Sequence, residues 1–208
     1  MINNTGMELL VNNAWSGSTV FEDSNGQGNN AITYNTDRPI NLHDNTDDPT
    51  YANGTTPDVI AMYIGINDFN TNNSKLGTFD SSAIDALITD NGDGTYTYGT
   101  ASSIIEAYAI TVHRMTVRYE DSDIFLFTML PNTWYKGKGV SEERLVEFNT
   151  AIKAIANKFG VDVVDLYSDT GITADNQAEY LIDGLHPNAK GMDLITACVE
   201  RALYAKYM

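Results

Sequence analysis

The stretch Val59-Ile60-Ala61-Met62-Tyr63-Ile64-Gly65-Ile66-Asn67-Asp68 decides the fold class. Its first six residues are all apolar or aromatic, follow Pro57 and stop at Gly65. A strand with one face in water alternates apolar and polar residues, whereas a strand covered on both faces is apolar throughout. The sequence therefore predicts a buried strand over residues 59–64, in a parallel sheet with helices on both faces.

Outward from this strand, apolar runs of strand length alternate with segments of helical period. Three more strands are expected at residues 9–11, 124–130 and 161–166, and three helices along the apolar stripes 104–119, 145–159 and 192–203. Strands that alternate with helices in this way build a parallel sheet. The sequence predicts an α/β fold with a mostly parallel sheet, as a single domain over residues 1–208, a length that buries one sizeable core.

The ends of two of these helices carry local signals. Ser103 and Glu106 fit a capping box at the start of the first helix. Ser141 precedes two glutamates at the start of the second helix, and Gly160 supplies its C-cap. His113 falls off the apolar stripe of the first helix, so its side chain is expected in solvent.

The charge balance excludes two classes of partner. The chain has 28 Asp and Glu against 12 Lys and Arg, a formal net charge of −16. This charge repels phosphate backbones and anionic lipid surfaces, so neither a nucleic acid nor a membrane is expected as a partner. One cysteine, Cys198, excludes an internal disulfide and a Cys-cluster metal site. The first residues also lack the basic segment and apolar core of a secretory signal.

Two stretches interrupt the alternation of strands and helices. Residues 21–57 are polar, and a connection of this length is unusual in a compact domain unless it shapes a site or is partly ordered by its own turns. Residues 87–98 hold turn residues between β-forming residues, which predicts a small inserted hairpin. The run Asp90-Asn91-Gly92-Asp93-Gly94 does not complete an EF-hand loop, so a plain turn is favoured over a calcium site.

The sharpest candidate for chemistry lies before the last helix, in Asp183-Gly184-Leu185-His186-Pro187. A carboxylate three residues before an imidazole can fold back onto Nδ1 in a turn. It then fixes the ring tautomer and stabilises the imidazolium, which leaves Nε2 as a general base. The alternative is a surface hydrogen bond without a function, which explains many Asp-x-x-His matches.

Two further candidates follow predicted strands. Asn67 stands at a strand carboxyl end, where ligands of parallel sheets collect, and its amide suits a developing oxyanion. In Ser16-Gly17-Ser18-Thr19, Gly17 can offer an unobstructed backbone N–H after the first strand. Each has a plainer interpretation, because Asn67-Asp68 is ordinary turn chemistry and Gly17 can be a bend.

Together the three stretches resemble blocks of the SGNH (GDSL-type) hydrolase family, in the family's order and approximate spacing. Residues 12–19 look like its second block, residues 65–68 are similar to its third, and residues 183–187 look like its fifth. The resemblance implies a flavodoxin-like, three-layer fold and ester hydrolysis through an acyl-enzyme.

The same resemblance implies the roles of four residues. Asp183 and His186 correspond to the catalytic partners of the nucleophile, and Gly17 and Asn67 to the oxyanion hole. It implies a small-molecule or glycan ester as the substrate, with no cofactor and no metal.

One block of the family is missing from this sequence. The family's nucleophile follows a first strand in a Gly-Asp-Ser motif, and no Gly-Asp-Ser occurs in the 208 residues. Ser16 and Ser18 lie on the oxyanion segment and would need a different geometry to pair with His186. The leading hypothesis is an SGNH esterase or acylhydrolase whose chain alone is inactive. The alternative is a non-catalytic pseudoenzyme or carbohydrate-binding module on the same fold.

The missing first strand also bears on the sheet. In the family it lies between the strands that correspond to residues 9–13 and 59–64. Buried backbone groups left unpaired cost roughly 1–3 kcal/mol each. We therefore expect either direct pairing of 9–13 with 59–64, which needs no partner, or a homo-oligomer in which another chain fills the gap by strand addition.

Overall fold

The computed structural model describes residues 6–10, 12, 14, 16–21, 56–133 and 141–208. Its strands are β1 (Val59–Met62), β2 (Ile88–Asp90), β3 (Tyr96–Tyr98), β4 (Asp123–Phe127) and β5 (Asp162–Val164). Its helices are α2 (Ile66–Asn72), the 3-10 turn η1 (Asn73–Lys75), α3 (Ser81–Ala86), α4 (Ile104–Arg118), α5 (Glu142–Phe159), α6 (Leu166–Asp169), α7 (Gln177–Tyr180) and α8 (Ala189–Tyr207). The parts of the predictions above that concern residues 11, 13, 15 and 22–55 lie outside the described residues.

Three of these strands form a parallel sheet in the order β1-β4-β5. Val59 stands opposite Asp123, and Phe125 stands opposite Asp162. Parallel neighbours need a crossover, and α4 and α5 supply the crossovers from β1 to β4 and from β4 to β5. The predicted parallel sheet is confirmed, although each of these strands is shorter than its apolar run.

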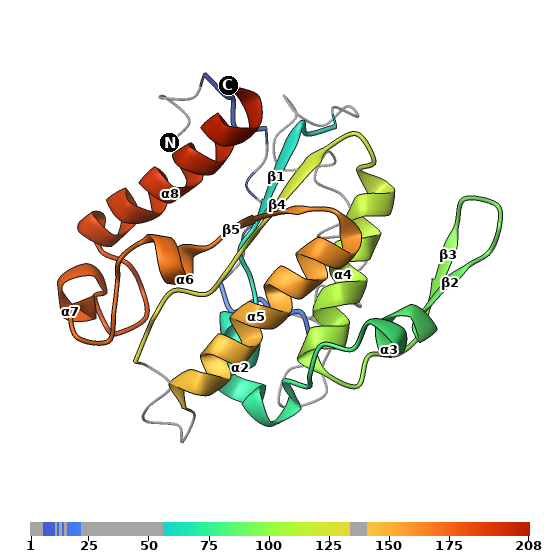
Figure 1. Ribbon diagram of the computed structural model, residues 1–208, viewed down its shortest axis with the longest axis horizontal. Helices are drawn as coiled ribbons and strands as arrows, with labels where there is room; N and C mark the ends of the chain where they lie inside the picture. The colour runs from blue at the N-terminus through green and yellow to red at the C-terminus, as the bar shows by residue number, and fades with distance from the viewer. Residues whose placement is uncertain (1–5, 11, 13, 15, 22–55, 134–140) are drawn as a thin grey trace.

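Helices cover both faces of this sheet, as the apolar run of β1 predicted (Figure 1). Alternate residues of β4 serve two different cores. Ile124 and Leu126 join the core built with α4 and α5, whereas Phe125 and Phe127 join the core built with α8. In Figure 1, α8 lies to the left of the strands and α4 to the right. The predicted flavodoxin-like, three-layer α/β fold is thus confirmed.

The helix-end signals were mostly correct. Ser103 Oγ accepts a hydrogen bond from the Glu106 backbone N–H at 3.2 Å, but Glu106 Oε2 accepts from Ser102, at 2.6 Å from its N and 2.8 Å from its Oγ. The reciprocal half of the predicted box is therefore displaced by one residue. Gly160 ends α5 in the left-handed region at φ 70°, as expected of a C-cap glycine. Ser141 precedes α5 without a side-chain cap bond.

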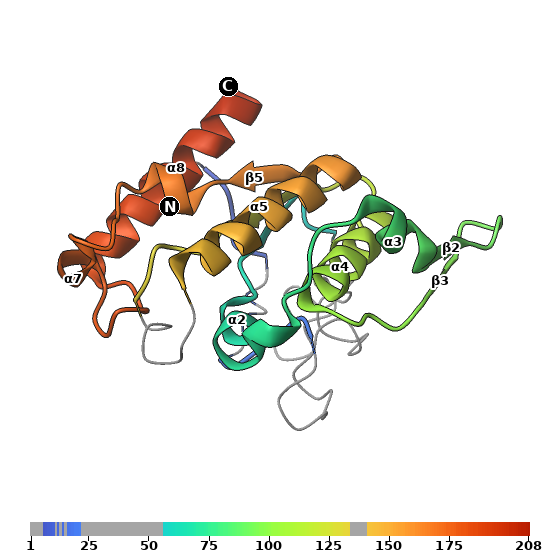
Figure 2. The ribbon, with the colours of Figure 1, turned by 60° about the horizontal axis from the view of Figure 1, so that its bottom comes forward.

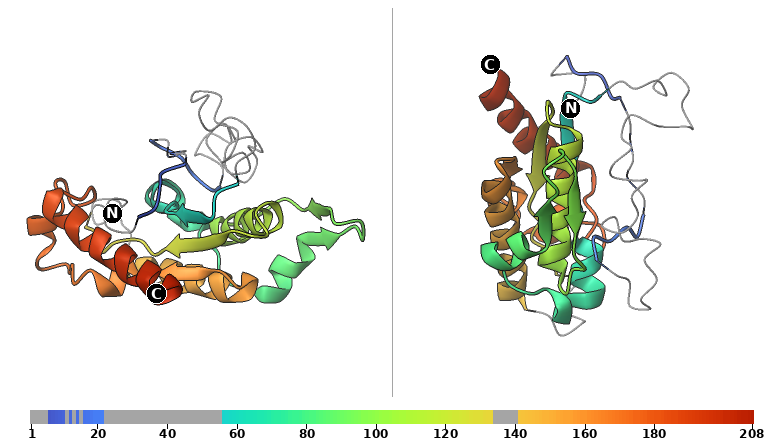
Figure 3. Two further views of the ribbon diagram at one scale, coloured as in Figure 1. Left: turned by 90° about the horizontal axis from the view of Figure 1, so that it is seen from above. Right: turned by 90° about the vertical axis from the view of Figure 1, so that its right-hand side faces the viewer.

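The strand expected at residues 9–11 is wrong where the chain is described. Leu9, Leu10 and Asn12 are not in a strand, and Leu9 is 52% exposed. Direct pairing of residues 9–13 with 59–64 is likewise wrong for Leu9, Leu10 and Asn12. In the described sheet β1 is an edge strand, and its one neighbour there is β4. In Figure 3 (right), the described residues of 6–21, drawn in blue, lie beside the sheet, on the side of β1. Two exposed or half-buried leucines offer too little burial to order a strand that has no ladder partner.

The inserted hairpin is confirmed, with β2 and β3 antiparallel and Ile88 opposite Tyr98. At its tip, Asp90 accepts from Gly92 N at 2.8 Å and Asp93 accepts from Thr95 N at 3.0 Å. These are the hydrogen bonds of Asx turns, in agreement with a plain turn.

The prediction for His113 was wrong. Its ring is half-buried between the hairpin and α5, with ring centroids 4.7 Å from Tyr96 and 5.3 Å from Phe159. Burial lowers its pKa, with the Lys158 charge acting in the same direction. The helical pattern placed His113 in solvent because it takes no account of the hairpin, which supplies the cover.

Candidate active site

The first part of the site is built by the turn from β1 into α2. Gly65 lies at φ 115°, and a Cβ there would stand 2.6 Å from Cζ of Phe148. Only glycine fits both the backbone angle and this close approach. The Gly65 carbonyl then accepts from Phe69 N at 2.9 Å, which starts α2 at once and places Asn67 and Asp68 in its first turn.

Asn67 is in contact with the other predicted oxyanion stretch. Its Nδ2 donates to the Ser18 carbonyl at 3.0 Å, although 49 residues separate the two in sequence. Gly17, the neighbour of Ser18, is exposed at φ 77°, and a Cβ added to it would meet nothing within 4 Å. The structure therefore brings the Gly17 and Asn67 stretches together. Ser16 is exposed and Ser18 is buried on the same stretch.

Asp68 binds the backbone of the same segment, and the sequence analysis did not identify it as a site residue. Its carboxylate accepts from Val20 N at 3.0 Å through Oδ2 and from Phe21 N at 2.7 Å through Oδ1. The side chain is wholly buried, and this burial raises the pKa of Asp68 to about 7 in spite of the backbone hydrogen bonds that lower it. The sequence signal was present in Asn67-Asp68, but it was interpreted as turn chemistry.

The second part of the site is the turn from Asp183 to His186. Asp183 Oδ1 accepts from the backbone N–H groups of Leu185 at 3.1 Å and His186 at 2.8 Å, and Oδ2 lies 2.7 Å from His186 Nδ1. Gly184, at φ 79°, permits the turn. The His186 backbone N–H and then its ring lower the pKa of Asp183 to about 2. The predicted carboxylate–imidazole hydrogen bond is confirmed, and it directs Nε2 away from Asp183.

Neighbouring backbone fixes where this turn lies. Ile182 N donates to the His186 carbonyl at 2.8 Å, and the turn leads into α8. Thr133 N, which follows β4, donates to the Gly184 carbonyl at 3.1 Å. The Asp183–His186 pair and the start of α2 thus both lie beyond the carboxyl ends of parallel strands. Figure 2, in which this end comes forward, shows α2 and α7 on that side. The catalytic roles of the four residues remain predictions.

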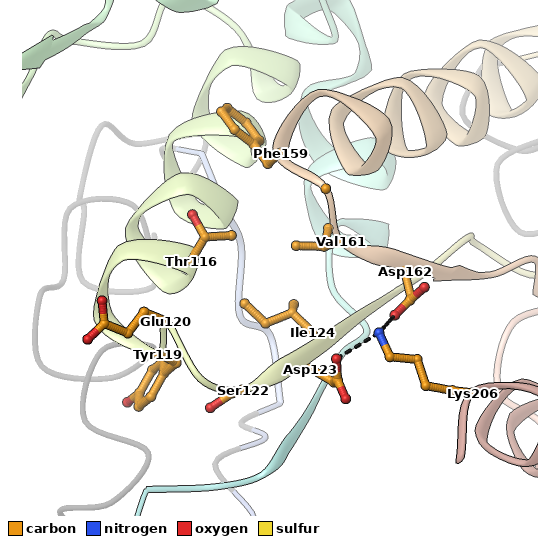
Figure 4. Close-up of a pocket in the computed structure, with 11 residues that line it drawn as sticks. Thr116, Tyr119, Glu120, Ser122, Asp123, Ile124, Phe159, Val161, Asp162 and Lys206 are labelled. Atoms are coloured by element: carbon orange, nitrogen blue, oxygen red, sulfur yellow. Dashed lines mark hydrogen bonds and ion pairs between the residues drawn. The ribbon is translucent and has the colours of Figure 1, made fainter. Parts of the chain in front are cut away.

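The opposite, amino end of the sheet holds a pocket of about 160 Å³ (Figure 4). Lys206 forms ion pairs there with Asp123 at 2.7 Å and Asp162 at 2.6 Å. These residues start β4 and β5, so this pocket lies away from Asn67 and His186. A wider hollow of about 350 Å³ adjoins the start of α5, lined by Glu142, Glu143, Val146, Glu147 and Tyr167.

The described part of the chain holds neither a cluster of metal ligands nor a membrane-spanning helix. Among those residues, no three His, Cys, Asp or Glu side chains gather as metal ligands would. Nor is any of the described helices long and apolar enough to cross a membrane.

The fold and site define an α/β protein of flavodoxin-like architecture, with an Asp–His pair and an Asn–backbone contact at the carboxyl end of a parallel sheet. The chain belongs to the GDSL-like lipase/acylhydrolase family, whose sequence model matches residues 3–194. The resemblance found in the three sequence stretches is thereby confirmed. A search of curated proteins found no match.

Solved structures share the fold at low sequence identity. A protein from Lactobacillus plantarum is 19% identical with a TM-score of 0.62, and the match covers 93% of this chain and 79% of that one. A carbohydrate esterase family 3 protein from Talaromyces cellulolyticus and a serine-to-alanine mutant of an acetyl esterase with acetate ion are each 22% identical, with a TM-score of 0.51 over 84% of this chain. This chain spans 65% of the length of each of these two esterases.

Proposed function

We propose that the protein carries the proton-transfer and oxyanion-binding half of a serine ester hydrolase. One observation carries the proposal: a 2.7 Å Asp183–His186 pair lies at the same end of the sheet as the Asn67–Ser18 contact. Ester hydrolysis needs a base near the nucleophile and donors near the carbonyl oxygen, and these two elements supply both kinds of group. Membership of the lipase/acylhydrolase family supports the same reaction class.

In this reaction the His186 Nε2 takes the proton of the attacking hydroxyl, whose oxygen bonds to the ester carbonyl carbon. Asp183 holds the imidazole by Nδ1 and stabilises the positive charge that forms on the ring. The Gly17 N–H and the Asn67 amide stabilise the tetrahedral oxyanion. The alcohol then leaves with the proton from His186, and water releases the acyl group by the same steps.

The attacking hydroxyl is the part that these 208 residues do not supply in the family's form. With no Gly-Asp-Ser motif, we propose that water attacks in its place in this chain, so that hydrolysis is slow. This same observation favours a second candidate, a pseudoenzyme that binds esters or glycans without cleaving them.

The proposed substrate is a small-molecule or glycan ester with a short acyl group. Two proteins of similar fold are named as a carbohydrate esterase and an acetyl esterase, which supports an acetyl ester. The net charge of −16 disfavours anionic substrates.

The test is hydrolysis of 4-nitrophenyl acetate by the purified chain and four variants, His186→Ala, His113→Gln, Ser16→Ala and Ser18→Ala. We expect slow turnover above the buffer rate, lowered about tenfold or more in His186→Ala, since a positioned general base contributes at least that much. His113→Gln is the matched control, because its ring lies against the hairpin and not at the site. Ser16→Ala should also leave the rate unchanged.

Two results would contradict the proposal. Equal rates for the unmodified chain and His186→Ala would remove the proposed base and favour the binding protein. Fast turnover that Ser16→Ala or Ser18→Ala abolishes would place the nucleophile on the segment of residues 16–21.

The outer edge of β1 supports a further proposal, self-association by strand addition. In the described sheet β1 has β4 on one side only, and Ala61 within this strand is exposed. Open strand edges pair with other chains unless something blocks them. Light scattering should give a mass above the 22.8 kDa of one chain, and Ala61→Lys should restore the monomer. A monomer at all concentrations would contradict this.

A further inference from the structure

We propose that Asp68 is a positioning residue that holds residues 16–21 in the geometry needed for oxyanion binding; this rests on the function proposed above. The described sections of this segment are joined to α2 by three hydrogen bonds. Asn67 holds the Ser18 carbonyl, while Asp68 accepts from the successive N–H groups of Val20 and Phe21. Gly17 stands one residue before the first of these contacts, so its N–H direction depends on them.

A carboxylate is suited to this task in a way that its nearest isostere is not. Asp68 uses both oxygens, Oδ2 for Val20 and Oδ1 for Phe21, at 3.0 and 2.7 Å. An asparagine has one acceptor oxygen, and its NH₂ would face the other backbone donor. Because the site is wholly buried, water cannot replace the lost acceptor.

The surroundings of Asp68 make its charge sensitive to pH near neutrality. Among the described residues, the ionisable group that acts on Asp68 is the phenol of Tyr108 on α4, whose pKa is raised by burial and by the charge of Asp68. Burial also raises the pKa of Asp68 to about 7, as described above. Protonation weakens one of the two acceptors. The tether is therefore complete only when Asp68 is ionised.

The experiment compares Asp68→Asn with Asp80→Asn. Asp80 is a matched control, since its carboxylate also accepts from two backbone N–H groups, Ser82 at 2.9 Å and Ala83 at 3.1 Å, but on the surface at the start of α3. For 4-nitrophenyl acetate, we expect Asp68→Asn to lower kcat about tenfold to 100-fold with KM within twofold, because misplaced oxyanion donors act on the transition state. Asp80→Asn should change neither constant.

A spectroscopic measurement on the unmodified protein needs no variant to fold. The amide proton resonances of Val20 and Phe21 should shift together with a midpoint near pH 7, as their acceptor ionises. The same titration should persist in Asp80→Asn and vanish in Asp68→Asn.

The possible outcomes separate this inference from the proposed function. If Asp68→Asn keeps the kcat of the Asp80→Asn control while His186→Ala abolishes hydrolysis, the function stands and the positioning role is overturned. If the unmodified chain hydrolyses no faster than His186→Ala, the proposed function is contradicted. In that case, constant Val20 and Phe21 resonances from pH 5 to 9 would overturn the tether as well, and a joint titration would support it.

Discussion

The two ends of the parallel sheet use the same kinds of side chain in opposite ways. At the amino end, Lys206 is bound by Asp123 of β4 and Asp162 of β5, and the Tyr207 hydroxyl donates to Asp123 at 2.5 Å. At the carboxyl end, His186 is bound by one carboxylate, which lies three residues away on its own turn. The first cluster joins α8 to two strands, whereas the second joins a turn to itself.

This difference separates stability from chemistry. Lys206 links α8 to β4 and β5, so it holds tertiary structure together, and its charge is already neutralised by the two carboxylates. The Asp183–His186 side chains are 48% and 69% exposed, and a local exposed pair adds little to folding. It instead fixes one nitrogen of the ring and leaves the other for a reaction. We infer that substitutions in the Lys206 cluster change stability and that substitutions in the Asp183–His186 pair change activity.

The largest expected effect on activity tests that division directly. Asp183→Asn should lower hydrolysis of 4-nitrophenyl acetate about tenfold or more, because the amide no longer holds the reactive tautomer or stabilises the imidazolium. Its melting temperature should stay within about 2 °C. Lys206→Met should do the reverse, lowering the melting temperature by a few degrees with an unchanged rate. Equal losses of activity in both variants would contradict the separation of the two ends.

An effect on stability is expected from the two glycines of the carboxyl end. Gly65→Ala puts a Cβ 2.6 Å from the buried Phe148 ring at a positive φ, so we expect a loss of more than about 3 kcal/mol in unfolding free energy. Gly17→Ala meets only the backbone strain at φ 77°, with open space around it, and should cost about 1–2 kcal/mol. Urea unfolding measures both. Similar costs would show that the Gly65–Phe148 contact relaxes easily.

The sequence predicted most of the sheet and the local part of the site. Asp183 and His186 are three residues apart, so turn chemistry alone indicated their hydrogen bond. The apolar run at residues 59–64 likewise revealed the covered strand. The contacts of Asp68 with Val20 and Phe21 span 48 and 47 residues, and no local pattern encodes them. The wrong prediction of a strand at Leu9 and Leu10 has the same origin, because a strand forms only where a neighbouring strand hydrogen-bonds to it.

A last expected effect is a difference in how the two ends respond to pH. Asp123 has its pKa lowered by hydrogen bonds from Lys206 and Tyr207, so its contribution to stability is present above its unfolded pKa, near 4, and is lost as pH falls below that. Asp68 has the opposite sign. Its folded pKa of about 7 exceeds the ordinary 3.8, so between pH 4 and 7 the folded state binds more protons than the unfolded state, and stability falls as pH rises.

Urea unfolding at pH 4.5 and pH 7.5 checks this sign. Relative to Asp68→Asn, the unmodified protein should lose about 1–3 kcal/mol of unfolding free energy between the two pH values, since one pKa unit corresponds to about 1.4 kcal/mol. Asp123→Asn should retain that loss, because its own titration lies below pH 4.5 in both states. The opposite result would be a gain in unfolding free energy of the unmodified protein, relative to Asp68→Asn, as pH rises. It would mean that the hydrogen bonds from Val20 and Phe21 outweigh the cost of burying the charge. Asp68 would then stabilise the carboxyl end as Asp123 stabilises the amino end, by remaining ionised.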